Sequence, residues 1–335
     1  MLKTDVLAWL AARHRPLLDY WQKGSSPPVV SLAAHCDMIY ALTLLGEPLD
    51  PGAVDGFVRL AATAGLPGWR SEQVKISVHN CAYLFGALNL LGEKAPLYEK
   101  VLHKRVLDLE SLVDYRTMQP RFPIMLAHHI WRVGHWIGGV PSIIVSVAES
   151  GSSWAPLFRD MVEPVLQAAH DLVDGDTHIL RPYDSPRLQA LFRRLYALRH
   201  DPKLADLGGT AHLLWADHVT GQSYAGLPRL LAEAREAFHQ RHPFMEAEPY
   251  CLDFDIVQLL RTGLEQSGES PQAEAGPAAE MMGAIEAFFA APPPRYRLHK
   301  LPGALAAYHE CALLAGMEAG ELGAPIDIIK RAHWI

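Results

Sequence analysis

The sequence predicts an all-α protein in which two kinds of helix alternate along the chain. Segments of the first kind, such as Ser77–Leu91, are apolar on nearly every side, which is the pattern of a helix buried on most of its faces. Segments of the second kind, such as Pro96–Val113, have an apolar stripe opposite a charged side. Runs of alternating β-branched residues between hairpin turns, the pattern of strands, are scarce.

We expect six helices of the first kind. Each has few charged residues, and several have small residues that let neighbouring helices approach closely. These inner helices are expected at Val30–Leu45, Ser77–Leu91, Trp131–Glu149, Leu207–His218, Leu252–Gln266 and Pro302–Ala319.

Amphipathic helices fill the intervals between them. Pro16 interrupts the first of these and predicts a kink or a split, whereas Pro51 stands at a favourable first helical position of the second. The apolar C-terminal stretch Ile328–Ile335 is expected to dock on the domain. The outer helices are expected at Asp5–Gln22, Asp50–Ala64, Pro96–Val113, Trp154–Asp174, Ser185–His200, Leu227–Arg241 and Pro277–Ala290.

The length allows one large core. The chain has 335 residues, of which 50% are hydrophobic. Two loop-like stretches, Gly268–Gly276 and Ala290–Arg297, are too short for interdomain linkers, and the helical pattern resumes after both. We therefore predict a single domain over residues 1–335.

Charge and composition exclude several classes of protein. The net charge is −7, and basic residues occur singly or in short pairs, which gives no nucleic-acid footprint. No apolar run reaches the roughly 18 residues of a membrane span, and Asp5 and Arg13 interrupt any signal-peptide core. The cysteines form no CxxC pair and suit reduced thiols. We expect a cytoplasmic protein that binds neither nucleic acid nor membrane.

Each inner helix has one polar side chain that stands out from its apolar surroundings. If inner and outer helices pair and close on themselves, they form an (α/α)6 toroid, which is the architecture we predict. An α-solenoid, with stricter repeats and polar ends, is the alternative. These side chains, called the polar markers here, are His35, His79, His135, His212, Asp253 and His309.

The pattern of alternating helices resembles the (α/α)6 toroid enzymes. These include the six-hairpin glycosidases, the related polysaccharide lyases, and the N-acylglucosamine 2-epimerase and sugar-isomerase group. The resemblance covers most of the chain and lies in architecture, because no family motif matches residue for residue. In such toroids the ends of the inner helices line a funnel that holds the active site. The resemblance thus implies that the polar markers surround one cavity for a sugar or short glycan.

Histidines near helix N-termini are candidates for proton transfer. The positive end of a helix lowers the pKa of a nearby histidine and leaves it neutral, in the state that accepts a proton. We expect His79, His135 and His309 to act in catalysis, and His35 and His212 to contact substrate. A hydrogen-bonded structural histidine is the alternative for any one of them.

Four carboxylates lie in or at the start of inner helices. Asp253 is placed to cap its helix, and Asp255 points to a different side of that helix. Asp255 and Asp37, facing each other across a funnel, would supply the acid and base of glycoside hydrolysis. Glu310 and Asp253 are expected to contact substrate, and structural ion pairs are the alternative.

The segment from His128 to Trp136 is rich in groups that bind sugars. Trp131 and Trp136 offer aromatic planes to the C–H face of a sugar ring, and Arg132 can hold a hydroxyl or carboxylate. We expect these residues and His128 to form a ligand wall. Packing of the tryptophans between helices is the alternative.

A second local set is His79-Asn80 with Tyr83 one turn later. It is similar to the Asn/His/Tyr sets with which polysaccharide lyases abstract a proton, although Asn80 is also placed to cap a helix. We expect Asn80, Tyr83 and Tyr250 to contact substrate.

All four cysteines lie within two residues of a polar marker. Converging Cys and His side chains would suit zinc. Free cysteines also fill small spaces where buried helices crowd together, and we prefer that interpretation, so no cofactor is expected. The cysteines are Cys36, Cys81, Cys251 and Cys311.

We therefore predict an enzyme that cleaves a glycosidic bond of a small or oligomeric sugar by acid–base chemistry of carboxylates and histidines. One alternative is a sugar epimerase or isomerase in which a ring of histidines moves protons. The other is a non-catalytic helical binding module, or a cyclase of a non-sugar substrate.

Overall fold

The computed structural model describes residues 1–109, 130–180, 186–198 and 200–335. Within these residues the regular elements are helices, accompanied only by isolated β-bridges. The predicted all-α class is confirmed.

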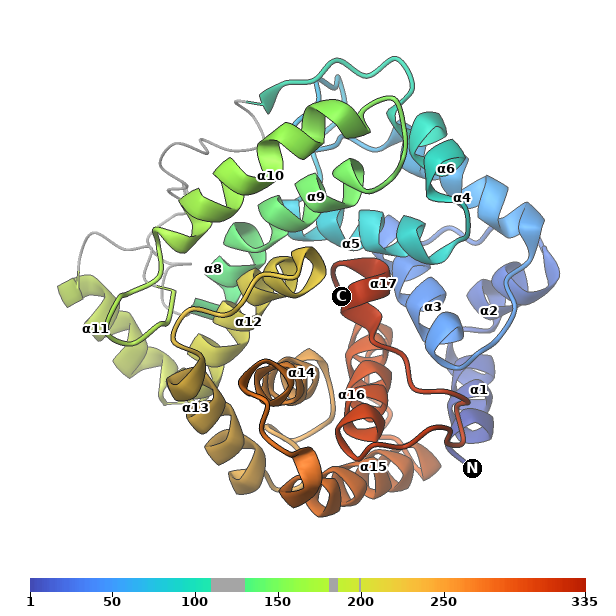
Figure 1. Ribbon diagram of the computed structural model, residues 1–335. Coiled ribbons are helices and arrows are strands. Elements are labelled where there is room, and N and C mark those ends of the chain that lie inside the picture. Colours follow the sequence, from blue (N-terminus) through green and yellow to red (C-terminus); the bar gives the residue numbers. More distant parts are fainter. Residues whose placement is uncertain (110–129, 181–185, 199) are drawn as a thin grey trace.

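The inner helices pack in a closed circuit. Helix α3 packs on α5, α5 on α9, α8 and α9 on α12, α12 on α14, α14 on α16, and α16 again on α3. Figure 1 shows these helices around a common centre, an arrangement compatible with a helical toroid. Their bounds are α3 (Leu32–Leu44), α5 (Val78–Leu90), α8 (Ile130–Ile137), α9 (Gly139–Ala148), α12 (Pro202–Thr220), α14 (Cys251–Ser267) and α16 (Leu301–Leu314).

The amphipathic helices lie outside this circuit (Figure 1). Helix α10 packs on α9, α13 on α14, and α15 on α16, and each turns its apolar stripe inward. The outer helices are α1 (Leu2–Arg13), α2 (Arg15–Lys23), α4 (Pro51–Thr63), α6 (Lys94–Leu102), α10 (Ala155–His170), α11 (Pro186–Tyr196), α13 (Leu227–Gln240) and α15 (Ala275–Ala290); two 3-10 turns are η2 (Pro271–Ala273) and η3 (Leu298–Lys300).

Side-chain caps fix where several helices begin. The hydroxyl of Ser31 accepts the N–H of Ala34 at the start of α3, and Ser77 does the same for Asn80 at the start of α5. Ser77, rather than Asn80, therefore caps α5, and the side chain of Asn80 is exposed.

Several boundaries differ from those predicted. The first helix is split, as Pro16 predicted, because α1 ends at Arg13 and α2 begins at Arg15. The expected helix at Trp131–Glu149 is two helices that meet at Gly138. Helix α12 is longer than expected, since Asp201 caps it well before the apolar segment.

Two other expected helices are shorter. The helix expected at Pro96–Val113 begins at Lys94 and ends at Leu102. Helix α16 ends at Leu314 rather than Ala319, because Gly316 adopts a left-handed conformation with φ of 67° that a helix cannot continue through.

Helices α8 and α12 touch backbone to backbone. A Cβ atom at Gly134 would come 2.3 Å from the carbonyl oxygen of Gly209, and one at Gly138 would come 2.3 Å from that of His212. Both distances are far below van der Waals contact, so only glycine fits at these two positions. This approach holds His135, between the two glycines, against α12.

The C-terminal residues fill the centre of the circuit. Helix α17 (Ile328–Ala332) packs on α5 and α12, and Figure 1 shows the C-terminus near the middle of the inner helices. Trp334 is 0% exposed. The Tyr40 hydroxyl donates to the Trp334 carbonyl, and the Asn89 amide donates to the Ala332 carbonyl at 3.0 Å. The expected docking of the tail is confirmed.

A buried ion network anchors the segment that leads into α17. Arg261 of α14 donates to the carboxylate of Glu310 and, at 2.9 Å, to that of Asp327. His218 also lies 2.8 Å from the Asp327 carboxylate. Burial alone would raise the pKa of Asp327, but His218 and Arg261 hold it well below its usual value.

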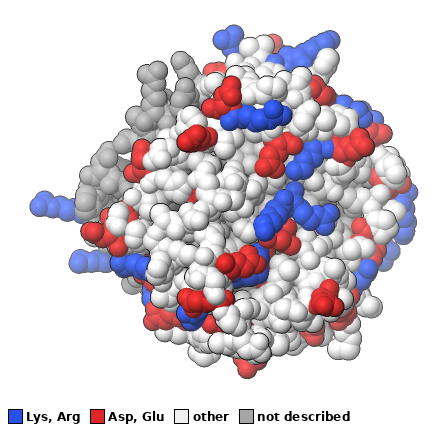
Figure 2. All heavy atoms as spheres, in the orientation of Figure 1, with Lys and Arg blue, Asp and Glu red and all other residues white. Residues whose placement is uncertain are grey.

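The surface is mixed in charge. Figure 2 shows acidic and basic side chains interspersed over the face drawn there. In the described part of the chain, none of the helices combines the length and the apolar character needed to cross a membrane.

Replacing Gly138 by alanine should push α8 and α12 apart. We expect Gly138→Ala to lower the free energy of unfolding by at least about 2 kcal/mol, as overpacking does in a tight core, measured by urea denaturation. Gly283 in α15 is the matched control, because an added Cβ there meets no atom within 4 Å. Gly283→Ala should stabilise by up to about 1 kcal/mol. Equal effects of the two substitutions would contradict the close approach.

Candidate functional site

A cluster of aromatic and histidine rings lies where α5, α8, α12 and the C-terminal tail meet. The rings of His79 and His135 are stacked with centroids 4.5 Å apart, and His135 meets His212 edge-on at 4.6 Å. The ring centroid of Trp334 lies 5.1 Å from that of His212 and 5.8 Å from that of His79. The structure thus brings together three of the polar markers that the sequence singled out.

His79 is held in one neutral tautomer. It lies in the first turn of α5, and its Nδ1 accepts a hydrogen bond at 3.3 Å from the indole N–H of Trp334, which can only donate. Burial, with smaller contributions from His299 and His212, lowers the pKa of His79 to about 3. A neutral ring whose Nδ1 accepts must have its proton on Nε2. His79 is therefore a neutral hydrogen-bond donor.

Asp37 and His299 form a second polar group beside His79. The carboxylate Oδ1 of Asp37 accepts from His299 Nδ1 at 2.8 Å and from the Tyr83 hydroxyl at 2.9 Å. Asp37 is buried in α3, whereas the His299 side chain in η3 is 52% exposed. The hydrogen bond to Asp37 raises the pKa of His299, against the effect of burial. Its Nδ1 bears a proton, which leaves Nε2 as the basic nitrogen.

His79 and His299 lie close together and have opposite protonation tendencies. The ring centroids of His79 and His299 are 6.1 Å apart, with the rings nearly perpendicular. The environment favours a neutral His79 and a readily protonated His299. Pairs of titratable groups whose pKa values are driven apart in this way are typical of acid–base sites.

This site lies at the N-terminal ends of the inner helices. Asp37 is in the first half of α3, His79 starts α5, and His299 directly precedes α16. At the other end of the same helices, His309 Nε2 donates to the carbonyl of Leu44 at 2.8 Å. Helices α3 and α16 therefore run in the same direction.

Other expected site residues have structural partners. His309 also accepts the N–H of Ile326 at 3.3 Å, so both its ring nitrogens are used. His35 accepts the indole N–H of Trp21 at 3.2 Å and packs beside α2 and α4, away from the centre. These two histidines fit the structural alternative.

The same holds for two of the carboxylates. Asp253 accepts the N–H groups of Met245 at 2.8 Å and Tyr250 at 3.0 Å, and in the latter bond it reaches back from the first turn of α14 to the buried N-cap residue Tyr250. Glu310 is fully buried in its ion pair with Arg261. His212, also buried, donates from Nδ1 to the carbonyl of Gly208.

The remaining expected residues are dispersed. Asp255 is 0% exposed within α14, so its carboxylate is closed to solvent. Trp136 is half-buried and packs against the core. His128 and the side chains of Trp131 and Arg132 lie outside the described residues, so the predicted ligand wall stays a prediction.

Two residues of the site were not predicted from the sequence. His299 lies in a short turn after the Pro-rich stretch, outside the expected inner helices, although a histidine just before a buried helix was a usable signal. Trp334 was expected to be buried with the tail, but nothing local indicated that its N–H would meet His79, 255 residues away in the sequence.

Metal binding receives no support from the described residues. Among them, no group of three or more His, Cys, Asp or Glu side chains is arranged to hold a metal ion. All four cysteines lie in described residues, and none is in a disulfide. Cys36, Cys81 and Cys311 are buried on inner helices.

Comparison with protein-family models, with curated proteins and with solved structures gave no match to this chain. Function is therefore inferred from the chemistry of the site and the arrangement of its helices.

Protonation of His212 should destabilise the protein in acid. Burial lowers its pKa to about 3, so below about pH 6.5 the unfolded chain binds a proton that the folded chain does not. Stability should fall as the pH drops from 7 to 5, by about 2 kcal/mol from this group. His212→Asn, whose amide can still donate to Gly208, should flatten that part of the stability curve measured by urea unfolding.

The exposed His103 provides the control for this experiment. His103→Gln should keep the wild-type slope of stability against pH. An unchanged slope in His212→Asn would show that His212 is not the group that titrates.

Proposed function

We propose that the chain is an acid–base enzyme that removes a carbon-bound proton beside a carbonyl or carboxylate of a sugar or short glycan. The single observation that supports this best is the pair of histidines with opposed protonation tendencies, His79 and His299, with ring centroids 6.1 Å apart. The proposal includes an (α/α)6-type toroid with its site at the N-terminal ends of the inner helices.

His299 is the proposed base. Asp37 fixes its Nδ1–H tautomer and stabilises the imidazolium that forms when Nε2 accepts a proton, the role that a carboxylate has beside a catalytic histidine in other enzymes. Tyr83 donates to the same oxygen of Asp37 and keeps that carboxylate oriented. The exposed ring of His299 is open to a substrate.

His79 is the proposed electrophile. When a carbon-bound proton leaves, its electron pair moves toward the carbonyl oxygen, which becomes negative. The N–H of a neutral imidazole can donate a hydrogen bond to that oxygen and stabilise the negative charge that develops there. This use of histidine is known from other proton-transfer enzymes. Trp334 keeps the proton of His79 on Nε2.

Two reactions share this first step. If the proton on His299 returns to the neighbouring carbon, the product is an isomer of the sugar, and if water delivers a proton to the opposite face, the product is an epimer. If the intermediate instead expels an oxygen at the β-position, that oxygen takes up the proton from His299, and the glycosidic bond breaks by elimination. The sugar class rests on the sequence pattern of alternating helices, which resembles that of sugar-acting toroids, and on a closed circuit of inner helices that is compatible with such an architecture.

Hydrolysis by two carboxylates is the less favoured form of bond cleavage. It needs two carboxyl groups that reach the substrate. Asp255 is 0% exposed, and Asp37 is already bonded to His299 and Tyr83. A proton-transfer mechanism needs no carboxylate that reaches the substrate, and it uses Asp37 as the hydrogen-bond partner of His299.

Exchange of carbon-bound hydrogen tests the proposal directly. The protein is incubated in D₂O with a panel of aldoses, ketoses, amino sugars and uronic-acid oligomers, and deuterium uptake is followed by NMR. We expect uptake with at least one of them, reduced at least about 10³-fold in His299→Gln and unchanged in His103→Gln. No exchange and no thermal shift with any sugar would overturn the sugar assignment.

The Asp37→Asn variant tests whether Asp37 acts on His299 or only stabilises the fold. Because Asp37 raises the pKa of His299, activity in wild type should fall as the pH drops through that raised pKa and His299 becomes protonated. Removing the carboxylate should lower the plateau rate and move this acid limb of kcat/KM to lower pH. A lower rate with an unmoved limb would contradict the assigned pairing.

A further inference from the structure

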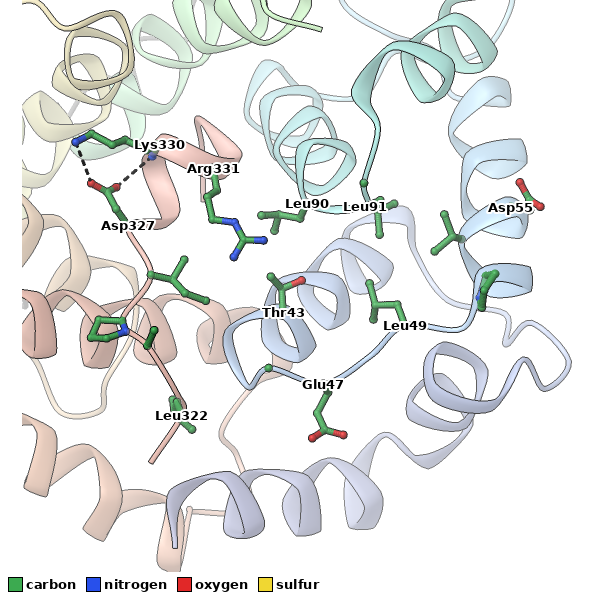
Figure 3. A pocket seen from close by; sticks show the side chains of 17 residues that line it. Thr43, Glu47, Leu49, Asp55, Leu90, Leu91, Leu322, Asp327, Lys330 and Arg331 are labelled. Carbon is green, nitrogen blue, oxygen red and sulfur yellow. Dashed lines mark hydrogen bonds and ion pairs between the residues drawn. The ribbon is translucent and has the colours of Figure 1, made fainter. Parts of the chain in front are cut away.

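A cavity lies at the opposite end of the inner helices from Asp37 and His299. It has a volume of about 1150 Å³ and is bordered by the last residues of α3 and α5 and by α17. Most of its lining is apolar and includes Leu49, Leu91 and Leu322. Figure 3 shows the Arg331 side chain extending from α17 into the space between the ends of α3 and α5.

The carboxylates in the wall of this cavity are already neutralised. Glu47 pairs with Lys3 at 2.8 Å, and Asp55 pairs with Lys100 at 3.2 Å. Asp327 is held by the buried ion network at its other side. None of these groups is left to balance a further positive charge.

Arg331 is different from these neighbours. It forms no hydrogen bond or ion pair with any residue that the structure describes, whereas Lys330 beside it lies 3.9 Å from the Asp327 carboxylate (Figure 3). Arg331 is exposed, and its guanidinium thus has no ion-pair partner among the described residues at the edge of a mainly apolar cavity. A guanidinium binds carboxylate and phosphate groups through two parallel hydrogen bonds.

We propose that this cavity binds a small amphipathic anion, with a carboxylate or phosphate on Arg331 and an apolar body against the leucine-rich wall. The cavity is large enough for such a molecule, since typical ligand pockets measure about 300–1,000 Å³. The site is independent of the acid–base site, because it lies at the other end of the helices and shares no residue with it.

Decanoate, decyl phosphate and the neutral 1-decanol are suitable probes, with binding to the full chain followed by isothermal titration calorimetry. We expect saturable one-to-one binding of at least one of the two anions and much weaker binding of the alcohol. Arg331→Gln should weaken anion binding at least about tenfold. Leu49→Glu, which adds a negative charge to the apolar wall, should weaken it as well.

Arg295→Gln is the matched control, because Arg295 is an exposed arginine outside the cavity. It should bind the anions as wild type does. The proposal is overturned if neither anion binds saturably, if 1-decanol binds as tightly as the anions, or if Arg331→Gln binds them unchanged. A lower melting temperature of Arg331→Gln with unchanged binding would instead assign Arg331 to stabilising the C-terminal ends of α3 and α5.

Discussion

The C-terminal tail in the centre of the helix circuit is the constraint on which the rest of the structure depends. Inner helices that pack side by side leave a central space, and an empty apolar space of that kind is costly. Here α17 and Trp334 fill it, and hydrogen bonds from Tyr40 and Asn89 fix the tail to two different inner helices. The ion network of Arg261, Glu310 and Asp327 anchors the segment just before it.

The same tail sets the chemistry of the site. The indole N–H of Trp334 selects the tautomer of His79, and burial, with smaller contributions from His299 and His212, keeps that histidine neutral. His299 lies outside this core and bonds to Asp37, so it tends toward protonation. One end of the circuit thus has a neutral, half-buried donor next to a more exposed base.

Local patterns were sufficient to predict where the inner helices lie, because a helix buried on most faces must be apolar all round, but they did not predict all the helix ends or the break at Gly138. They also picked out His79, since a histidine followed by Asn80 stands out at the start of an apolar segment. They could not tell which side of its helix each polar residue faces. His35 turns outward toward Trp21, and His309 bonds to Leu44, so neither joins the central cluster. The pairing of Asp37 with His299 joins residues 262 positions apart, and no local signal records such a contact.

The most direct test of this account is the protonation state of the two histidines, read at pH 7 from the ¹⁵N chemical shifts of the imidazole rings by NMR and assigned with His79→Gln and His299→Gln. The account predicts that His79 is neutral with its proton on Nε2 and that Nδ1 of His299 is protonated. A charged His79, or a neutral His79 with its proton on Nδ1, would contradict both the bond from Trp334 and the proposed division of roles.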